Sequence, residues 1–144
     1  LIVHDPRDPG ACDGRPRRQL ASLNDLYPTI CALAGVPVGP QVEVGASLVP
    51  LLHRADGPEV HADLLMTYLA GNHSIRTPEW RYMRYRDGGE ELYDMRRDPE
   101  QQRNLAGNPE VADIQNRFIK RLDDWVEGQV LDSGKSRHQG NLDE

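Results

Sequence analysis

Apolar and polar residues follow one another differently in the two halves of the chain, and the first half is typical of helices with connecting loops. Residues 1–3 are apolar and Asp5-Pro6 follows, which predicts a buried strand that runs into a loop. A helix is expected up to Gly35, with Asn24 as its N-cap, because Pro28 lacks an N–H and is tolerated only in a first turn. Its apolar face, at helical spacing, consists of Leu26, Ile30, Leu33 and Ala34.

A second, shorter helix is expected after Ser47, which can act as its capping residue. Leu48, Leu51 and Leu52 follow at helical spacing, and a loop at residues 54–58 ends the segment. We expect the two helices to cover one face of a sheet.

From residue 64 onward the pattern changes to that of strands. The strand-like runs are residues 64–69, 74–77, 80–86 and 91–93. Gly71-Asn72 separates the first two runs. Asp87-Gly88-Gly89 predicts a hairpin between the last two, because glycine accepts the positive φ that such turns require. The pattern therefore predicts a small antiparallel sheet.

A long helix is predicted to pack on this sheet. Asn108-Pro109 is typical of a helix start, and Gly128 is expected to end the helix. Its apolar stripe consists of Val111, Ile114, Phe118, Leu122, Trp125 and Val126. Residues 131–144 are too polar to repay their ordering entropy, so we expect a disordered tail there.

Composition and charge exclude several classes of protein. The chain has 144 residues, which is enough for one hydrophobic core. Its 13 glycines and 11 prolines predict that much of the chain forms loops. The net charge of -6 argues against a protein that binds nucleic acid or an anionic membrane, since both need a basic surface. No apolar run is long enough to cross a bilayer.

The chain supplies few candidate catalytic groups. Cys12 has no base beside it and is interpreted as a loop residue, whereas Cys31 is expected to pack inside a helix. Two cysteines give neither a disulfide framework nor the spacing of a zinc site, so they do not indicate in which redox compartment the protein resides. Asp5, Asp8 and Asp13 do not have the spacing of a calcium loop, and no histidine pair has zinc-protease spacing. We therefore expect no catalytic residue and no metal ligand here.

Asn72 and His73 are the candidate substrate-binding residues. They lie in the break between two predicted strands, where a loop can direct polar side chains toward a ligand. An amide and an imidazole suit a sulfate ester or a sugar hydroxyl. From the residues alone, an exposed polar pair in a turn is the favoured interpretation, because turns are rich in asparagine whatever their function.

The order of several runs resembles the C-terminal part of a type I sulfatase of the alkaline-phosphatase-like superfamily, nearest to iduronate-2-sulfatase-like and choline-sulfatase-like bacterial members. The resemblance covers about residues 1–127. The runs that carry it are residues 1–3, 22–29, 45–52, 74–77 and 91–94. It narrows the margin by which the exposed-turn interpretation of Asn72 and His73 is favoured over ligand binding, and it is consistent with a periplasmic or secreted protein.

The resemblance implies an α+β fold that is the C-terminal piece of an α/β sulfatase. Residues 1–60 would end the large domain with a strand and two helices, and residues 61–130 would form the antiparallel-sheet subdomain with its closing helix. The parent would use a calcium ion and a formylglycine hydrate, formed from the cysteine of a Cys-x-Pro-Ser-Arg motif. Cys12 does not fit this motif, because Asp13-Gly14-Arg15-Pro16 follows it. The catalytic groups are therefore expected upstream of Leu1.

The expected function is that of a C-terminal fragment of an enzyme that hydrolyses a sulfated sugar or a small alcohol sulfate. The fragment alone is expected to be inactive, because the covalent and metal chemistry needs groups that it lacks. Two alternatives stay open: a phosphate or phosphonate ester hydrolase on the same scaffold, and a module that binds sulfated glycans without cleaving them. An uncovered strand edge at residues 1–3 would favour homo-oligomers.

Overall fold

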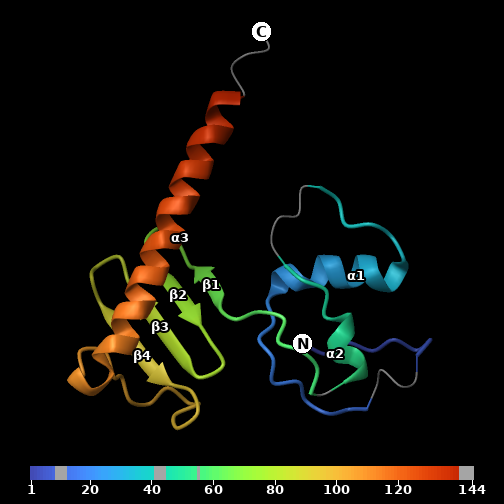
Figure 1. The fold of residues 1–144 in the computed structure, drawn as a ribbon, viewed down its shortest axis with the longest axis horizontal. Helices are drawn as coiled ribbons and strands as arrows, with labels where there is room; N and C mark the ends of the chain where they lie inside the picture. Colours follow the sequence, from blue (N-terminus) through green and yellow to red (C-terminus); the bar gives the residue numbers. More distant parts are fainter. Residues whose placement is uncertain (9–12, 41–44, 55, 140–144) are drawn as a thin grey trace. The chain divides into compact units, whose positions relative to one another are not determined.

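The computed structural model describes residues 1–8, 13–40, 45–54 and 56–139, with residues 129–139 as backbone only. Two compact units are present, Leu1–Leu64 and Leu65–Glu144 (Figure 1). Together they give the predicted α+β fold class. Cys12 lies outside the described residues. Among the helices of the described part, none combines the length and the apolar character needed to cross a membrane.

The first unit is built from short helices and loops. A 3-10 turn, η2 (Leu23–Asp25), leads into α1 (Leu26–Ala34), and the predicted second helix is present as α2 (Val49–His53) (Figure 1). Its N-cap is Leu48 and not the predicted Ser47, although Ser47 Oγ accepts the Val49 N–H at 3.3 Å. The N-cap of α1 is Asp25, one residue after the predicted Asn24, and it makes no side-chain capping bond to this helix. The side-chain cap belongs to η2, where Ser22 Oγ accepts the Asn24 N–H at 3.2 Å. Gly35 ends α1 at φ 68°, as predicted.

The predicted apolar face of α1 is not its buried face. The buried residues of α1 are Pro28, Thr29 and Cys31, whereas Ile30 is 63% exposed. The Thr29 hydroxyl donates to the Asp25 carbonyl at 2.6 Å and accepts the Leu48 N–H at 2.8 Å. These polar contacts, and not the apolar stripe, orient the helix within its unit.

Residues 1–3 do not form the predicted buried strand. Leu1 is 77% exposed and Ile2 is 96% exposed, and neither is assigned to a strand. No described segment forms a ladder with this run. A strand needs such a ladder to satisfy its backbone groups.

The second unit contains the predicted sheet. Its strands are β1 (Leu64–Thr67), β2 (His73–Arg76), β3 (Trp80–Arg84) and β4 (Glu90–Asp94). They are arranged in the order β1-β2-β3-β4, and β3 is antiparallel to both β2 and β4. The β3–β4 turn confirms the hairpin prediction: Gly88 has φ 88°, and the Tyr85 N–H donates to the Gly89 carbonyl at 2.9 Å.

One face of the sheet is covered by a long helix. Ile75, Tyr82 and Leu92 are opposite one another in the register of β2, β3 and β4, and all three are essentially inaccessible. Phe118 and Leu122 pack against them, with the rings of Tyr82 and Phe118 stacked at 6.2 Å between centroids. The predicted stripe therefore forms the core of this unit.

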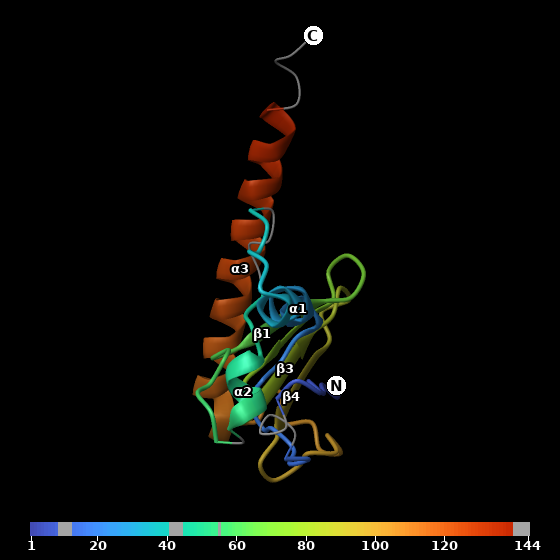
Figure 2. The same cartoon turned by 90° about the vertical axis from the view of Figure 1, so that its right-hand side faces the viewer.

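This helix, α3 (Ala112–Gln139), starts after a 3-10 turn, η3 (Pro109–Val111), capped by Asn108. It lies along the sheet and continues beyond it (Figures 1 and 2). The predicted end at Gly128 is wrong, because a single glycine costs about 1 kcal/mol in a helix and does not by itself end one. The backbone of residues 131–139 is helical, and residues 140–144 lie outside the described part.

Candidate functional site

His73 begins β2 and lies on the sheet face that α3 covers. Its Nδ1 is 2.9 Å from Thr67 Oγ1, at the end of β1. Its ring lies edge-on to Trp125 of α3, with 5.9 Å between the ring centroids. The imidazole is half-buried, so one polar contact and one aromatic contact fix its orientation.

The electrostatic surroundings keep this imidazole neutral near pH 7. Burial first, and then the positive charge of Arg84, lower the pKa of His73 from its ordinary value. Arg84 lies opposite His73 in the register of β2 and β3, and its Nη1 is 2.7 Å from Asp123 Oδ1. A neutral imidazole has one donor and one acceptor nitrogen. Within the described ranges, Nε2 has no hydrogen-bond partner, so it can bind a ligand.

Asn72 mainly stabilises the turn in which it lies. Its Oδ1 accepts the Arg86 N–H at 3.2 Å, which ties the β1–β2 turn to the β3–β4 turn. Its main-chain oxygen accepts the Tyr68 N–H at 2.9 Å. Asn72 also borders a shallow hollow with Tyr85, Arg86 and Asp87. The structure therefore directs Asn72 toward the β3–β4 turn and His73 toward α3, and it does not bring the two side chains together.

Three residues beside His73 were not predicted as parts of a site: Thr67, Arg84 and Trp125. Thr67 and Arg84 come from the strands before and after β2, and Trp125 was assigned only to the core stripe. Arg84 would be identified only by the register of β2 and β3, which is set by the short turn at residues 77–79 between them. Thr67 would follow from the same argument applied to the β1–β2 turn.

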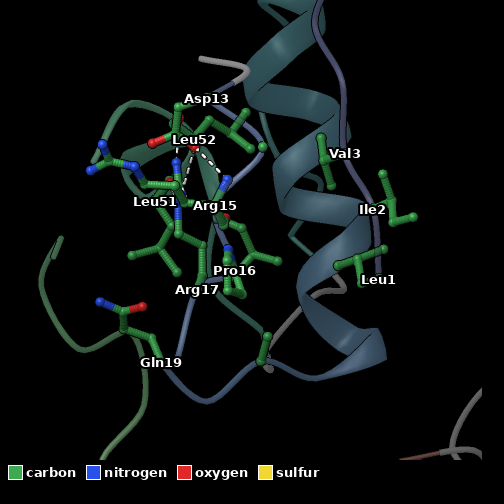
Figure 3. A pocket seen from close by; sticks show the side chains of 13 residues that line it. Leu1, Ile2, Val3, Asp13, Arg15, Pro16, Arg17, Gln19, Leu51 and Leu52 are labelled. Carbon is green, nitrogen blue, oxygen red and sulfur yellow. Dashed lines mark hydrogen bonds and ion pairs between the residues drawn. The ribbon is translucent and has the colours of Figure 1, made fainter. Parts of the chain in front are cut away.

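A separate cavity of about 700 Å³ lies in the first unit (Figure 3). Leu1, Leu51 and Leu52 are among the apolar residues that line it. Arg17 donates from Nε to the Leu51 carbonyl at 2.6 Å and from Nη1 to Asp13 Oδ1 at 2.8 Å. Its guanidinium therefore holds the loop at Asp13 onto α2, which is a structural role.

Among the described residues, Asp25 is the most buried carboxylate, and its role is structural. It accepts hydrogen bonds from the N–H of Ser22 at 2.6 Å and of Ala46 at 2.8 Å, and His61 Nε2 lies 2.8 Å from it. Burial would raise the pKa of this carboxyl, but these three groups together hold it below its ordinary value. The carboxylate is thus fully engaged in joining three segments of the first unit.

The described residues do not fit a calcium ion. Nowhere in residues 1–8, 13–40, 45–54 and 56–128 do three or more histidine, cysteine, aspartate or glutamate side chains gather in a way that could hold a metal. Calcium prefers six to eight oxygen ligands, which this part of the chain does not bring together.

Comparison with known proteins identifies the family. Residues 7–128 match the family described as N-sulphoglucosamine sulphohydrolase, C-terminal, and the chain belongs to this family. A delta 4,5-hexuronate-2-O-sulfatase of Bacteroides thetaiotaomicron is 37% identical over an alignment of 111 residues that covers 71% of this chain and 23% of that protein. The predicted relationship to the C-terminal part of sulfatases is confirmed.

Solved structures agree with this assignment. A 2-O GAG sulfatase has a TM-score of 0.62 and 32% identity, and the match covers 77% of this chain and 26% of that one. A phosphonate monoester hydrolase of Agrobacterium radiobacter shares the fold, with a TM-score of 0.63 at 22% identity over 83% of this chain and 27% of the other. The chain thus spans about a quarter of the length of these proteins.

Proposed function

We propose that this chain is the C-terminal part of a longer enzyme that hydrolyses sulfate esters. The observation that carries the proposal is the family match over residues 7–128, together with the four-stranded sheet and covering helix. The nucleophile and the metal site would come from the remaining part of the enzyme, where the expected formylglycine and calcium belong. The chain alone would then be inactive.

The exposed apolar residues of the first unit support a larger parent. Its exposed large hydrophobic residues are Leu1, Ile2, Leu23, Tyr27, Ile30, Val36 and Val38. Soluble proteins seldom leave so many apolar side chains uncovered in one small unit, because burying each would contribute roughly 1.5–3 kcal/mol. Packing against the remaining part of the enzyme would supply that burial.

The proposed substrate is a sulfated sugar that contains a uronate. Two relatives support this choice by their names, one a hexuronate-2-O-sulfatase and the other a 2-O GAG sulfatase. The phosphonate monoester hydrolase is only 22% identical, so it supports the shared fold and not the reaction. A sulfated polysaccharide is met outside the cytoplasm, and we place the enzyme in the periplasm or outside the cell.

His73 is the residue of this chain that we assign to the substrate. Its ring is fixed by Thr67 and Trp125, it is neutral near pH 7, and its Nε2 is available. A hydrogen bond from this nitrogen to a sugar hydroxyl or a sulfate oxygen would select the ester. Asn72 would support it by holding the β1–β2 turn in place.

The reaction is tested by sulfate release from an unsaturated uronate-2-sulfate disaccharide. The full-length enzyme should release sulfate, and this chain alone should release none. A phosphonate monoester assayed in parallel addresses the alternative. If the full-length enzyme cleaved the phosphonate and not the sulfate ester, the proposed function would be wrong.

The role of His73 is tested by His73→Ala in the full-length enzyme. Loss of one hydrogen bond of about 1 kcal/mol should raise KM roughly fivefold, with a smaller change in kcat. His53→Ala is the matched control, because His53 is an exposed histidine on α2. An unchanged KM in His73→Ala would remove His73 from the substrate site and leave the assigned reaction untouched.

A further inference from the structure

The sheet face opposite α3 carries two arginines side by side. Arg76 of β2 lies directly opposite Arg81 of β3 in the antiparallel register. Opposed residues of such a pair project on the same face, with Cβ atoms about 5 Å apart. Ile75 faces the core under α3, so alternation places both guanidinium groups on the other face. Two like charges at this spacing repel each other.

Neither arginine has a counter-ion in the described part of the chain. Arg81 donates to two neutral acceptors, Ser74 Oγ at 3.4 Å and Gln101 Oε1 at 3.0 Å. Arg76 makes no side-chain hydrogen bond or ion pair with any described residue. By comparison, the half-buried Arg84 of the same sheet is paired with a carboxylate at 2.7 Å.

The two guanidinium groups are also partly removed from water. Both arginines are half-buried, and two neighbours on the same face are nearly inaccessible, Ser74 at 9% and Tyr93 at 8%. Burial, and then the charge of Arg81, lower the pKa of Arg76. A guanidinium stays protonated in proteins, so this unfavourable energy persists until an anion offsets it.

We infer that Arg76 and Arg81 together bind one carboxylate side chain from the part of the full-length protein that lies outside this chain. The inference rests on the proposed function, in which this chain is one part of a longer sulfatase. Two adjacent guanidinium groups can hold the two oxygens of a carboxylate, and the amide of Gln101 lies beside them. The contact would fix the sheet of the second unit onto the remaining protein.

A permanent protein partner fits the position better than a diffusible anion does. The pair lies on rigid, hydrogen-bonded strands, with nearly inaccessible neighbours, and not on a mobile loop. A carboxylate of the same protein would neutralise it in every state, whereas a substrate sulfate would do so only while bound. The relatives are about four times as long as this chain, so ample protein surface exists to supply the partner.

The test compares Arg76→Gln, Arg81→Gln and the double variant in the full-length enzyme. Each single variant should lower the midpoint of thermal unfolding by roughly 5 °C, because it leaves a half-buried carboxylate poorly paired. The double variant should lower it by clearly less than the sum, since both arginines share one partner. KM should stay unchanged at temperatures where the variants are folded.

Arg97→Gln is the matched control, because the Arg97 side chain is 88% exposed, and its midpoint should stay near that of the unaltered enzyme. A KM that rises tenfold in Arg76→Gln with an unchanged midpoint would overturn the inference and assign the pair to a sulfate or carboxylate of the substrate. Additive midpoint shifts would also overturn it. Absence of sulfate release by the unaltered enzyme would reject the proposed function instead. The midpoints of thermal unfolding do not depend on activity, so they would still test the paired arginines.

Discussion

Each of the two units of this chain is stabilised internally by a different kind of interaction. In the second unit, Ile75, Tyr82, Leu92, Phe118 and Leu122 form one continuous apolar core between a sheet and a helix. In the first unit the apolar core is small, and the fully buried Asp25 carboxylate joins the start of α1, the residues before α2 and the segment at His61.

This difference has consequences for stability. Apolar burial is spread over many contacts, so the second unit should keep its structure without any partner. Hydrogen bonds to one buried carboxylate are directional and depend on every partner being present. The first unit should therefore be the less stable one, and the exposed side chains of Ile2 and Ile30 indicate where a neighbour would add stability.

The chain carries a separate probe for each unit. Trp80 and Trp125 both belong to the second unit, so intrinsic tryptophan fluorescence reports its unfolding. Cys31 is buried in the first unit, so its reaction with a thiol reagent reports the opening of that unit. Replacement of Cys12 by serine leaves Cys31 as the single thiol.

The largest effect is expected from Asp25→Ala. It removes a buried acceptor from two N–H groups and from His61, so the free energy of unfolding of the first unit should fall by roughly 3–5 kcal/mol. Cys31 should react much faster, while the urea midpoint of tryptophan fluorescence should not move. Asp56→Ala is the control, because that side chain is 84% exposed and should change little. A parallel shift of both probes would mean that the two units unfold as one.

A slightly smaller effect is expected from Leu122→Ala, which tests the second unit. The leucine is fully buried against the sheet, so its truncation should lower the free energy of unfolding by about 3 kcal/mol. The fluorescence midpoint in urea should fall, and Cys31 reactivity should stay the same. Leu69→Ala, at a 70% exposed site, should leave both probes unchanged. Faster reaction of Cys31 in Leu122→Ala would contradict the independence of the two units.

The same difference explains what the sequence could predict. The strands, the hairpin at Gly88 and the stripe of α3 were predictable, because the core of the second unit is made by local periodicity. The buried face of α1 was not, because it depends on Thr29 and Asp25, whose partners come from segments far along the chain. Polar contacts of that kind leave no periodic pattern.

The candidate site was predictable only in part, for a similar reason. His73 was singled out because a break between strands was expected at this position, whereas the structure makes it the first residue of β2. Its partners Arg84 and Trp125 could not, because one depends on the strand register and the other on how α3 lies across the sheet. The position of Asn72 in the sequence also gave no indication that its side-chain oxygen accepts a hydrogen bond from the Arg86 N–H.

Acid should weaken the first unit through Asp25. The folded-state pKa of this carboxyl lies below its ordinary value of about 4, so the unfolded state binds protons first as the pH falls. The contribution of Asp25 is therefore fully present above pH 4 and is lost as the pH falls through the folded-state pKa. Cys31 reactivity measured between about pH 6 and about pH 3 should rise at the acidic end, with the thiolate fraction of a model peptide used as correction. Asp25→Asn should abolish this rise, and a rise of equal size in that variant would assign the acid sensitivity to other groups.

The smallest effect is expected in the second unit, through His73. Burial and Arg84 lower its pKa, so the unfolded state, with its ordinary value of about 6.5, takes up a proton more readily than the folded state. The contribution of His73 to the free energy of unfolding of the second unit should be constant above pH 6.5 and should decline as the pH falls from there toward the folded-state pKa. Urea midpoints of tryptophan fluorescence at about pH 8 and about pH 5.5 should differ, and His73→Gln should reduce that difference. If His73→Gln kept the full pH dependence, the imidazole would not be the neutral, ligand-ready group on which the substrate assignment depends.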